Sequence, residues 1–309
     1  MSDTIHMQLA LSQAPHKIYQ ALTDSTALAH WFSEAADVSL PEKRYDFWGR
    51  FTPGNPNRTE GRHPLLEANP DQRLRYAWQF GEHGTTVDFA LRPQQEQTIV
   101  ILQHAKDQPG AKVPWTGEDF WFLSLENLRR YLDGRDVVRC DFSIAPSVYG
   151  EIEQSVEIDA PPDQVFEALI DPQQLERWIA SRARVEPRVG GVYDIGWELS
   201  GTVKILELEP NARLVYLWAA YQDEPETIVT WTLEGSGGKT RLTIVQSGFA
   251  PEMPLDGLYQ GWLHFLQRIK SLVEYGGDWQ PAIKKIDPQT HSYYAAPIVA
   301  GQKDLLAVE

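Results

Sequence analysis

The chain of 309 residues carries 43 acidic and 28 basic side chains, and its net charge of −15 repels phosphate backbones, so no nucleic acid is expected as a partner. Hydrophobic residues make up 42% and charged residues 23% of the chain, and no apolar run is long enough for membrane insertion. The length fits two domains better than one core, and because the first residues lack the pattern of an export signal, the predicted location is cytoplasmic.

One sequence pattern occurs twice in the chain. The two segments are PHKIYQALTDSTALAHW at 15–31 and PDQVFEALIDPQQLERW at 162–178, with the same Pro, Ala, Leu, Asp, Leu and Trp at matched positions. A repeat spaced by about half of the length indicates two copies of one structural unit. We therefore expect two similar domains in tandem.

Each copy opens with a strand and two short helices. Residues 5–12 alternate between apolar and polar, and the stretch after Ile152 does the same, which is typical of a half-buried strand. A proline after each strand starts a short helix, and Asp24 or Asp171 breaks it. A second short helix is then expected to end at the tryptophan of each repeat.

Short segments rich in β-branched and aromatic residues then predict an antiparallel meander. In the second copy they lie at 185–193, 201–208, 214–218, 228–233 and 240–245. The first copy matches through PDQRLRYAW at 70–78, against PNARLVYLW at 210–218. From its tryptophan to the next matched glycine, the first copy spans 30 residues against 23 in the second. The extra length is placed at 53–57, a turn-rich loop that is either a lid or a tolerated insertion.

Each copy closes with an amphipathic helix. Apolar residues fall at steps of three and four from Trp121 to Leu132 and from Leu258 to Val273. A meander cannot cover both of its own faces, so the simplest arrangement wraps the sheet round this helix. The expected fold class is α+β, with two tandem domains. Each is a curved antiparallel sheet around a long C-terminal helix, with two short helices after the first strand.

The predicted domains span 1–134 and 151–276. A linker at 135–150 joins them, and a tail at 277–309 follows. Trp279, Tyr293 and Tyr294 suggest that this tail packs on the body of the protein.

This order of elements resembles the family named after the activator of Hsp90 ATPase, within the helix-grip (SRPBCC) group of START domains, polyketide cyclases and the birch-pollen allergen. In the second copy the resemblance rests on APPDQVFEALIDPQQLERW, VGGVYDI, GTVKILELEPNARLVYLW and GWLHFLQRIKSL, and it covers about residues 151–275. The first copy keeps the Trp31, PDQRLRYAW and Trp121 segments but has Asp-Phe-Trp-Gly at 46–49, where the paired glycines would fall. The resemblance implies two helix-grip domains, whose relatives hold hydrophobic molecules between the long helix and the sheet.

The residues expected to line this cleft are aromatic or apolar, and most are matched between the copies. They are Trp31, Trp78, His104, Trp121 and Leu125 in the first copy, and Trp178, Trp218, Trp231, Trp262 and Leu266 in the second. For each tryptophan the alternative is a plain core side chain, since aromatic stripes usually serve packing.

A few polar residues are candidates for chemistry. His104 lies at the end of the last predicted strand of its copy, where the second copy has Gln246, and it is either a polar group in the first cavity or a surface or turn histidine. His30 is interpreted as a solvated helix-end residue, and His264 is expected to be exposed beside the apolar stripe of its helix. Cys140 is interpreted as a small buried residue rather than a reactive thiol.

No pattern supports a metal or another cofactor, because no His, Cys or carboxylate set shows ligand spacing. No nucleophile elbow is present either, so catalytic residues stay unknown. The segment GSGGKT at 235–240 superficially resembles a phosphate loop, but Leu233 occupies the place of a required glycine and strands flank it on both sides. It is therefore predicted to be a hairpin turn.

Three functions stay open. The first is a binding module whose partner is a small hydrophobic or aromatic molecule, without catalysis. The second is an enzyme of the cyclase or aromatase kind, in which a His, Tyr or Arg moves protons on a polyketide-like substrate. The third is an interaction protein that contacts the chaperone, although a second helix-grip copy stands here in place of the chaperone-binding domain of eukaryotic Hsp90 activators.

Overall fold

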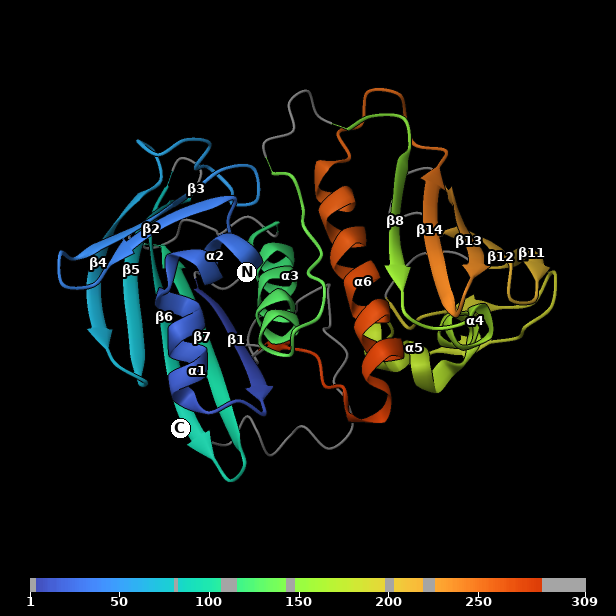
Figure 1. The fold of residues 1–309 in the computed structure, drawn as a ribbon. Helices are drawn as coiled ribbons and strands as arrows, with labels where there is room; N and C mark the ends of the chain where they lie inside the picture. Colours follow the sequence, from blue (N-terminus) through green and yellow to red (C-terminus); the bar gives the residue numbers. More distant parts are fainter. Residues whose placement is uncertain are drawn as a thin grey trace. The chain divides into compact units, whose positions relative to one another are not determined.

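The computed structural model describes residues 4–80, 83–106, 116–142, 148–197, 203–218 and 226–284. These residues form two compact units, one within 4–142 together with 282–284, and the other within 148–281. Both are α+β helix-grip domains, as predicted, in which an antiparallel sheet curves around a long helix (Figure 1).

The first unit contains an antiparallel sheet in the order β15-β1-β7-β6-β5-β4-β3-β2, with the long helix α3 after β7. Its strands are β1 (Thr4–Leu11), β2 (Ala35–Ser39), β3 (Arg44–Trp48), β4 (Arg62–Asn69), β5 (Arg73–Phe80), β6 (His83–Gln94), β7 (Gln97–Lys106) and β15 (Ile283–Lys284). Its helices are α1 (Pro15–Thr23), α2 (Ser25–Trp31) and α3 (Thr116–Leu132).

The second unit repeats this plan with the sheet order β11-β12-β13-β14-β8 and a separate β9-β10 pair. Its strands are β8 (Ile152–Ile158), β9 (Arg184–Val185), β10 (Tyr193–Asp194), β11 (Ile205–Glu209), β12 (Arg213–Trp218), β13 (Thr227–Ser236) and β14 (Lys239–Ser247). Its helices are α4 (Pro162–Ile170), α5 (Pro172–Trp178), α6 (Asp256–Tyr275) and the short 3-10 helix η1 (Gly276–Asp278).

The repeated segment forms the two short helices and the turn between them. Trp31 Nε1 donates to the carbonyl oxygen of Ala21, and Trp178 Nε1 donates to that of Ala168, at 2.9 Å in both units. The aspartate between the helices caps the second helix with its side chain in each copy. The repeat is therefore explained by one hydrogen-bonded helix pair built twice.

In each unit a tyrosine fixes the second strand after the helix pair to the first helix. Tyr45 Oη donates to the carbonyl oxygen of Leu22, and Tyr193 Oη donates to that of Leu169, at 2.8 Å in both. These bonds make the two tyrosines equivalent, and they match β3 of the first unit with β10 of the second.

The expectation that residues 46–49 replace the paired glycines is wrong. Because the two tyrosines are equivalent, the glycines at 190–191 fall opposite residues 42–43. Lys43, opposite Gly191, adopts a φ of 53°, and Gly190, opposite Glu42, adopts a φ of 77°, so each copy has one left-handed residue at this turn, one position apart. The first copy makes the turn with a lysine, which hides it from the glycine pattern.

Two other expected segments have different outcomes. Residues 185–193, expected as one strand, form the two strands β9 and β10, because the chain turns at Gly190 between them. Residues 235–240 join β13 to β14 as the predicted hairpin turn, and its two central glycines adopt φ of 59° and 80°.

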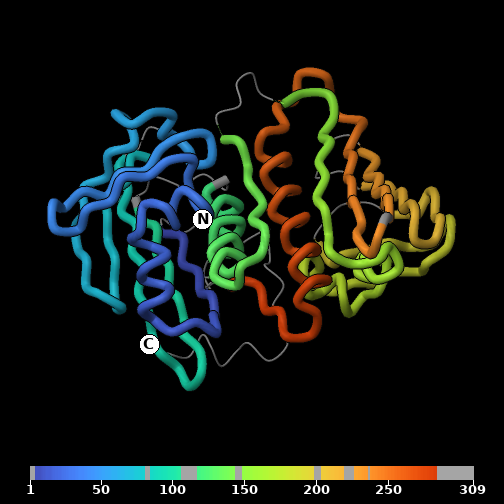
Figure 2. The backbone as a smooth tube through the Cα atoms, viewed as in Figure 1, coloured from blue at the N-terminus to red at the C-terminus, as the bar shows by residue number. Residues whose placement is uncertain are grey.

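Part of the C-terminal segment belongs to the first unit. β15 pairs with β1, and Ile283 lies opposite Gln8. In Figure 2, β1 is blue and the segment after α6 is red. Trp279 is buried, whereas Tyr293 and Tyr294 lie outside the described residues. The exact limits of linker and tail remain predictions. Among the described helices, none has the length and apolar character needed to cross a bilayer.

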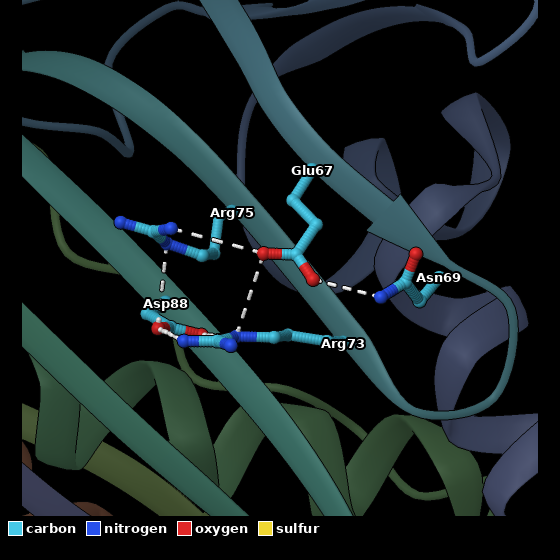
Figure 3. A network of polar contacts seen from close by, with 5 residues as sticks. All are labelled: Glu67, Asn69, Arg73, Arg75 and Asp88. Carbon is cyan, nitrogen blue, oxygen red and sulfur yellow. Dashed lines mark hydrogen bonds and ion pairs between the residues drawn. The ribbon is translucent and has the colours of Figure 1, made fainter.

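The outer face of the first sheet carries a polar network across β4, β5 and β6 (Figure 3). Arg73 and Arg75 each lie between Glu67 and Asp88, and Asn69 donates to Glu67 at 2.7 Å. Such cross-strand pairs between partly exposed side chains stabilise the register of a sheet without filling its core.

Candidate functional site

Three predicted site residues of the first unit lie together in its interior. His104 from β7 and Trp78 from β5 stack with an interplanar angle of 4° and ring centroids 5.6 Å apart. Trp121 from α3 meets both rings edge-on, at 6.0 Å from Trp78 and 5.8 Å from His104. All three are at most 1% exposed, and Leu125 is buried one turn further along α3. The long helix and the sheet are therefore joined here by packed rings.

A chain of hydrogen bonds fixes the protonation of His104. Trp121 Nε1 donates to His104 Nδ1 at 2.8 Å, and His104 Nε2 lies 2.8 Å from Thr85 Oγ1, which itself donates to the carbonyl oxygen of Trp78. An indole can only donate, so the imidazole carries its proton on Nε2 and is neutral. Burial lowers the pKa of His104 to about 3.

His104 is therefore a neutral connector between α3 and the sheet. The expectation of a surface or turn histidine is wrong, because the side chain lies wholly inside the domain. With both ring nitrogens engaged and the pKa near 3, the imidazole does not take up a proton near neutral pH. His104 thus joins the core of the first unit.

The longer loop of the first copy covers the end of this cluster. Asn55 Oδ1 accepts the indole N–H of Trp78, and Asn55 Nδ2 donates to the carbonyl oxygen of Glu60 at 3.1 Å. Asn55 is 1% exposed, and Thr52 of the same loop is buried too. Phe32 and Phe47 are among the rings that pack against Trp78, at 6.2 and 5.2 Å. Trp78 is thereby closed off from solvent.

The second unit contains an equivalent series of hydrogen bonds, with a glutamine in place of the histidine. Trp262 Nε1 on α6 donates to Gln246 Oε1 on β14 at 2.6 Å, and Gln246 Nε2 donates to Thr227 Oγ1 on β13 at 2.9 Å. These residues stand where the first unit has Trp121, His104 and Thr85. The amide reproduces the acceptor and donor of the neutral imidazole, and it does not titrate.

The second unit differs at the outer end of this chain, where four rings form what we call the aromatic edge. Trp218 lies 5.4 Å from Trp262 and 5.5 Å from Trp197, and Trp197 lies 5.6 Å from Phe265. Trp262 and Phe265 are buried, whereas Trp218 and Trp197 are half-buried. Trp218 is the counterpart of Trp78, so the same sequence position is closed in one unit and partly open in the other.

The other predicted residues of the second unit lie deeper. Trp231 meets Trp178 at 6.1 Å and Trp262 at 5.7 Å, and Leu266 is fully buried on α6. The indole N–H of Trp178 is held by a backbone carbonyl, as in its counterpart Trp31. These side chains form the floor beneath the aromatic edge and pack as core.

Sequence reasoning missed three residues that define this difference between the units. Trp197 lies two residues after the end of the VGGVYDI motif, but its counterpart in the first copy is Gly49, so a search for matched tryptophans omits it. Phe265 was visible only as part of an apolar stripe. Asn55 stands in a turn-rich loop, and nothing in the sequence indicated that its side chain enters the core.

The remaining polar candidates have separate outcomes. His30 is exposed at the end of α2, in agreement with its interpretation as a solvated residue. His264 is buried rather than exposed, because α6 is buried along almost its whole circumference from Trp262 to Leu272, and its ring lies 4.0 Å from that of Phe265. Burial raises the pKa of the Cys140 thiol to about 12, which leaves it protonated and unreactive near neutral pH.

The rings and polar groups around the Trp121–His104 and Trp262–Gln246 hydrogen bonds are therefore neutral. Burial raises the pKa of the Tyr193 and Tyr216 phenols, and it lowers the pKa of His63 to about 4, so these groups carry no charge near neutral pH. Within the described ranges, no group of three or more His, Cys, Asp or Glu side chains could hold a metal ion. An arrangement of this kind can hold an uncharged flat molecule by ring contacts and single hydrogen bonds.

Comparison with known proteins places one family match on each unit. The model of the activator of Hsp90 ATPase homolog 1-like protein family matches residues 13–133 and 159–274. None of the curated proteins matches the sequence.

Solved structures include several that resemble one unit or most of the chain. Protein MLL2253 from Mesorhizobium loti is 29% identical over 41% of this chain and 98% of its own, with a TM-score of 0.38. Protein CV1439 from Chromobacterium violaceum is 31% identical over 40% of this chain and 97% of its own, with a TM-score of 0.35. DynU16, a protein in the dynemicin biosynthetic locus, is 17% identical over 89% of this chain and 99% of its own, with a TM-score of 0.34.

Proposed function

The chain belongs to the activator of Hsp90 ATPase homolog 1-like family, and from this premise we propose that its second unit binds a small aromatic molecule at the aromatic edge. In this proposal the first unit has a filled interior and a structural role, and it binds no ligand. The observation that carries the proposal is the contrast between Trp218, which is half-buried, and its counterpart Trp78, which is 1% exposed.

Ring geometry at the aromatic edge supports an aromatic ligand. Trp197 and Trp218 stand at an interplanar angle of 87°, so together they present the face of one indole and the edge of another. A flat ligand can stack on the face and meet the edge, and each such ring pair contributes about 0.5–1.5 kcal/mol beyond the burial of apolar area. The Trp197 N–H is already bonded to the carbonyl oxygen of Ile179, which holds that ring in place.

The polar groups beside the aromatic edge support binding rather than proton transfer. Gln246 and Thr227 carry no charge and have no pKa in the accessible range, whereas a cyclase needs a group that gives or takes a proton at the reacting atom. The proposed function is therefore a binding module without catalysis. Contact with a chaperone stays a prediction from the family.

Direct binding of a defined probe tests this proposal. Titration with 2-naphthol, followed by calorimetry and by quenching of tryptophan fluorescence, is expected to show one site in the intact protein. Trp218→Ala should weaken the binding by about tenfold or more, because it removes an aromatic anchor.

A matched control separates this effect from a general loss of aromatic surface. Trp48 is half-buried on β3 of the first unit, where it lies near the guanidinium of Arg58. Trp48→Ala should leave the affinity for 2-naphthol within about twofold of the original. Absence of binding to the intact protein, or equal losses in both variants, would contradict the proposal.

A further inference from the structure

Apolar side chains gather on the outer face of the second sheet. Tyr216 of β12 and Val229 of β13 point inward and are at most 2% exposed, so the residues next to them in each strand point outward. Ile228 is 39% exposed on this outer face, and Leu217 lies opposite it and is half-buried. Two apolar side chains are therefore neighbours across the outside of the sheet.

The apolar group continues onto the adjacent strands. Val215 points outward on β12, and Thr230 lies between it and Val245 of β14. Leu206 is the extra residue of a β-bulge in β11, between the residues opposite Tyr216 and Val215, and it is 41% exposed. We call this group the outer patch, and its members are Leu206, Val215, Leu217, Ile228 and Val245.

The first unit carries polar side chains at the matched places. Counted from the matched tryptophans, Val215 corresponds to Arg75 of the network in Figure 3, and Ile228 corresponds to Thr86. The fold therefore does not require an apolar outer face. Single exposed apolar residues are common on protein surfaces, but a contiguous group with a polar rim is typical of an interaction surface.

Carboxylates surround the outer patch. Glu153 of β8 lies opposite Val245 and is exposed. Glu226, which directly precedes β13, and Glu209 at the end of β11 are exposed as well. An apolar surface with such a rim favours a partner that brings positive charge beside its own apolar residues.

Most cations on these strands are already engaged. Lys204, which directly precedes β11, is exposed, whereas the other basic side chains lie in ion pairs. These pairs are Arg213–Glu207, Lys239–Asp159 and Arg241–Glu157. The whole chain has a net charge of −15, so a second copy is repelled from an acidic rim and a basic partner is attracted to it.

We propose that the outer patch binds a basic amphipathic helix of a partner protein. The backbone groups of an inner strand are already paired within the sheet, so its face offers only side chains, and strand addition needs a free edge. The apolar stripe of a helix covers such a face, with Ile228 and Leu206 beneath it, while lysines or arginines beside the stripe meet the surrounding carboxylates. This inference goes beyond the proposed function, because Trp218 of the aromatic edge points to the inner side of the sheet.

Two helical peptides of opposite charge test the nature of the partner. Each has about 15 residues with leucines at helical spacing, and the remaining positions are lysine in one peptide and glutamate in the other. Calorimetry with the intact protein is expected to show that the Leu/Lys peptide binds at least about tenfold more tightly than the Leu/Glu peptide. Equal affinities for the two peptides would overturn the assignment of a basic partner.

A pair of variants tests the place of binding. Ile228→Thr introduces the residue of the first unit at an exposed position, and it should weaken binding of the Leu/Lys peptide by about tenfold, because it removes an apolar contact. Leu66→Thr is the matched control, since Leu66 is the bulge residue of the first unit, is 51% exposed and lies beside the charged network. This control should leave the affinity within about twofold of the original.

The remaining outcomes all count against the inference. If Ile228→Thr and Leu66→Thr bind the Leu/Lys peptide as the intact protein does, the peptide lies elsewhere on the acidic surface. If neither peptide binds, the outer patch is not a docking site for a helix. If sedimentation shows that the intact protein self-associates and Ile228→Thr abolishes this, a second copy covers the outer patch instead. None of these results affects the binding of 2-naphthol, so the proposed function stands or fails separately.

Discussion

The two units share one fold and differ in how far the matched residues Trp78 and Trp218 are exposed to solvent. In both, a tryptophan and a tyrosine are hydrogen-bonded to the first helix, and an indole N–H joins the long helix to the sheet. In the first unit a longer loop inserts Asn55 against Trp78, and in the second Trp218 stays half-buried beside Trp197. A helix-grip domain can therefore lose or keep an accessible aromatic surface through one loop, with its core plan unchanged.

The comparison also shows which polar contacts belong to the scaffold. His104 and Gln246 occupy the same place and make the same pair of bonds, one as a neutral imidazole and the other as an amide. General acid–base catalysis at this position cannot be common to both units, because the amide of Gln246 does not titrate. What they share is the connection between helix and sheet.

Substituting the matched tryptophans by alanine should give the largest difference in free energy of unfolding between the two units. Trp78→Ala removes a fully buried ring and leaves a cavity, so we expect the free energy of unfolding of the first unit to fall by about 3–5 kcal/mol. Trp218→Ala removes a half-buried ring and should cost about 1–2 kcal/mol in the second unit. Urea unfolding followed by circular dichroism measures both, and equal costs would contradict a closed and an open unit.

Acid should weaken the first unit through His104. The pKa of this histidine is about 3 in the folded unit and about 6.5 in an unfolded chain, so below pH 6.5 the unfolded state binds more protons. Stability is therefore lost as the pH falls from about 6.5 toward 3, by about 1.4 kcal/mol for each pH unit from this group.

His104→Gln tests this pH dependence, because it copies the second unit and removes the titration. The stability of the first unit in the variant, measured by urea unfolding at a series of pH values, should fall less steeply toward acid. His63, whose pKa is lowered to about 4, contributes in the same direction and is present in both proteins. Identical pH profiles would show that His104 is not buried as a neutral group.

The contact between loop and core in the first unit should have an intermediate effect. Asn55→Ala leaves the Trp78 N–H without its acceptor, and we expect a loss of about 1–2 kcal/mol together with greater quenching of tryptophan fluorescence by acrylamide. Asn69→Ala is the matched control, since this asparagine is exposed and bonds only to Glu67 in the network of Figure 3. If quenching is the same in both variants, Asn55 does not close the unit.

The outer polar network should have the smallest effect. Asp88→Asn removes the carboxylate that Arg73 and Arg75 share, but both arginines are substantially exposed, so the cost should be about 0.2–1 kcal/mol and should shrink in high salt. Unfolding at two salt concentrations measures this. A loss above about 2 kcal/mol that is insensitive to salt would show that the network is part of the core rather than of the surface.

Much of the fold was predictable because its signals are local. The repeat at 15–31 and 162–178 indicated the helix pair, and the matched PDQRLRYAW and PNARLVYLW segments indicated the equivalent strands β5 and β12. The glycine turn was less visible, since in the first copy the residue with positive φ at this turn is Lys43, one position after the match of Gly190. Residue identity is a weaker guide than geometry where a lysine tolerates the φ that glycine prefers.

The sequence by itself determined two tandem α+β helix-grip domains, because periodicity and turn residues act over a few neighbours and occur twice. Only the tertiary structure decided in which unit this tryptophan is closed off from solvent and which histidines are buried as neutral groups. Burial and hydrogen-bond partners arise from residues far apart in the chain, as with Asn55 and Trp78 or Gln154 and Tyr259. No local pattern records those contacts, although the contact between Asn55 and Trp78 is one that distinguishes the two units.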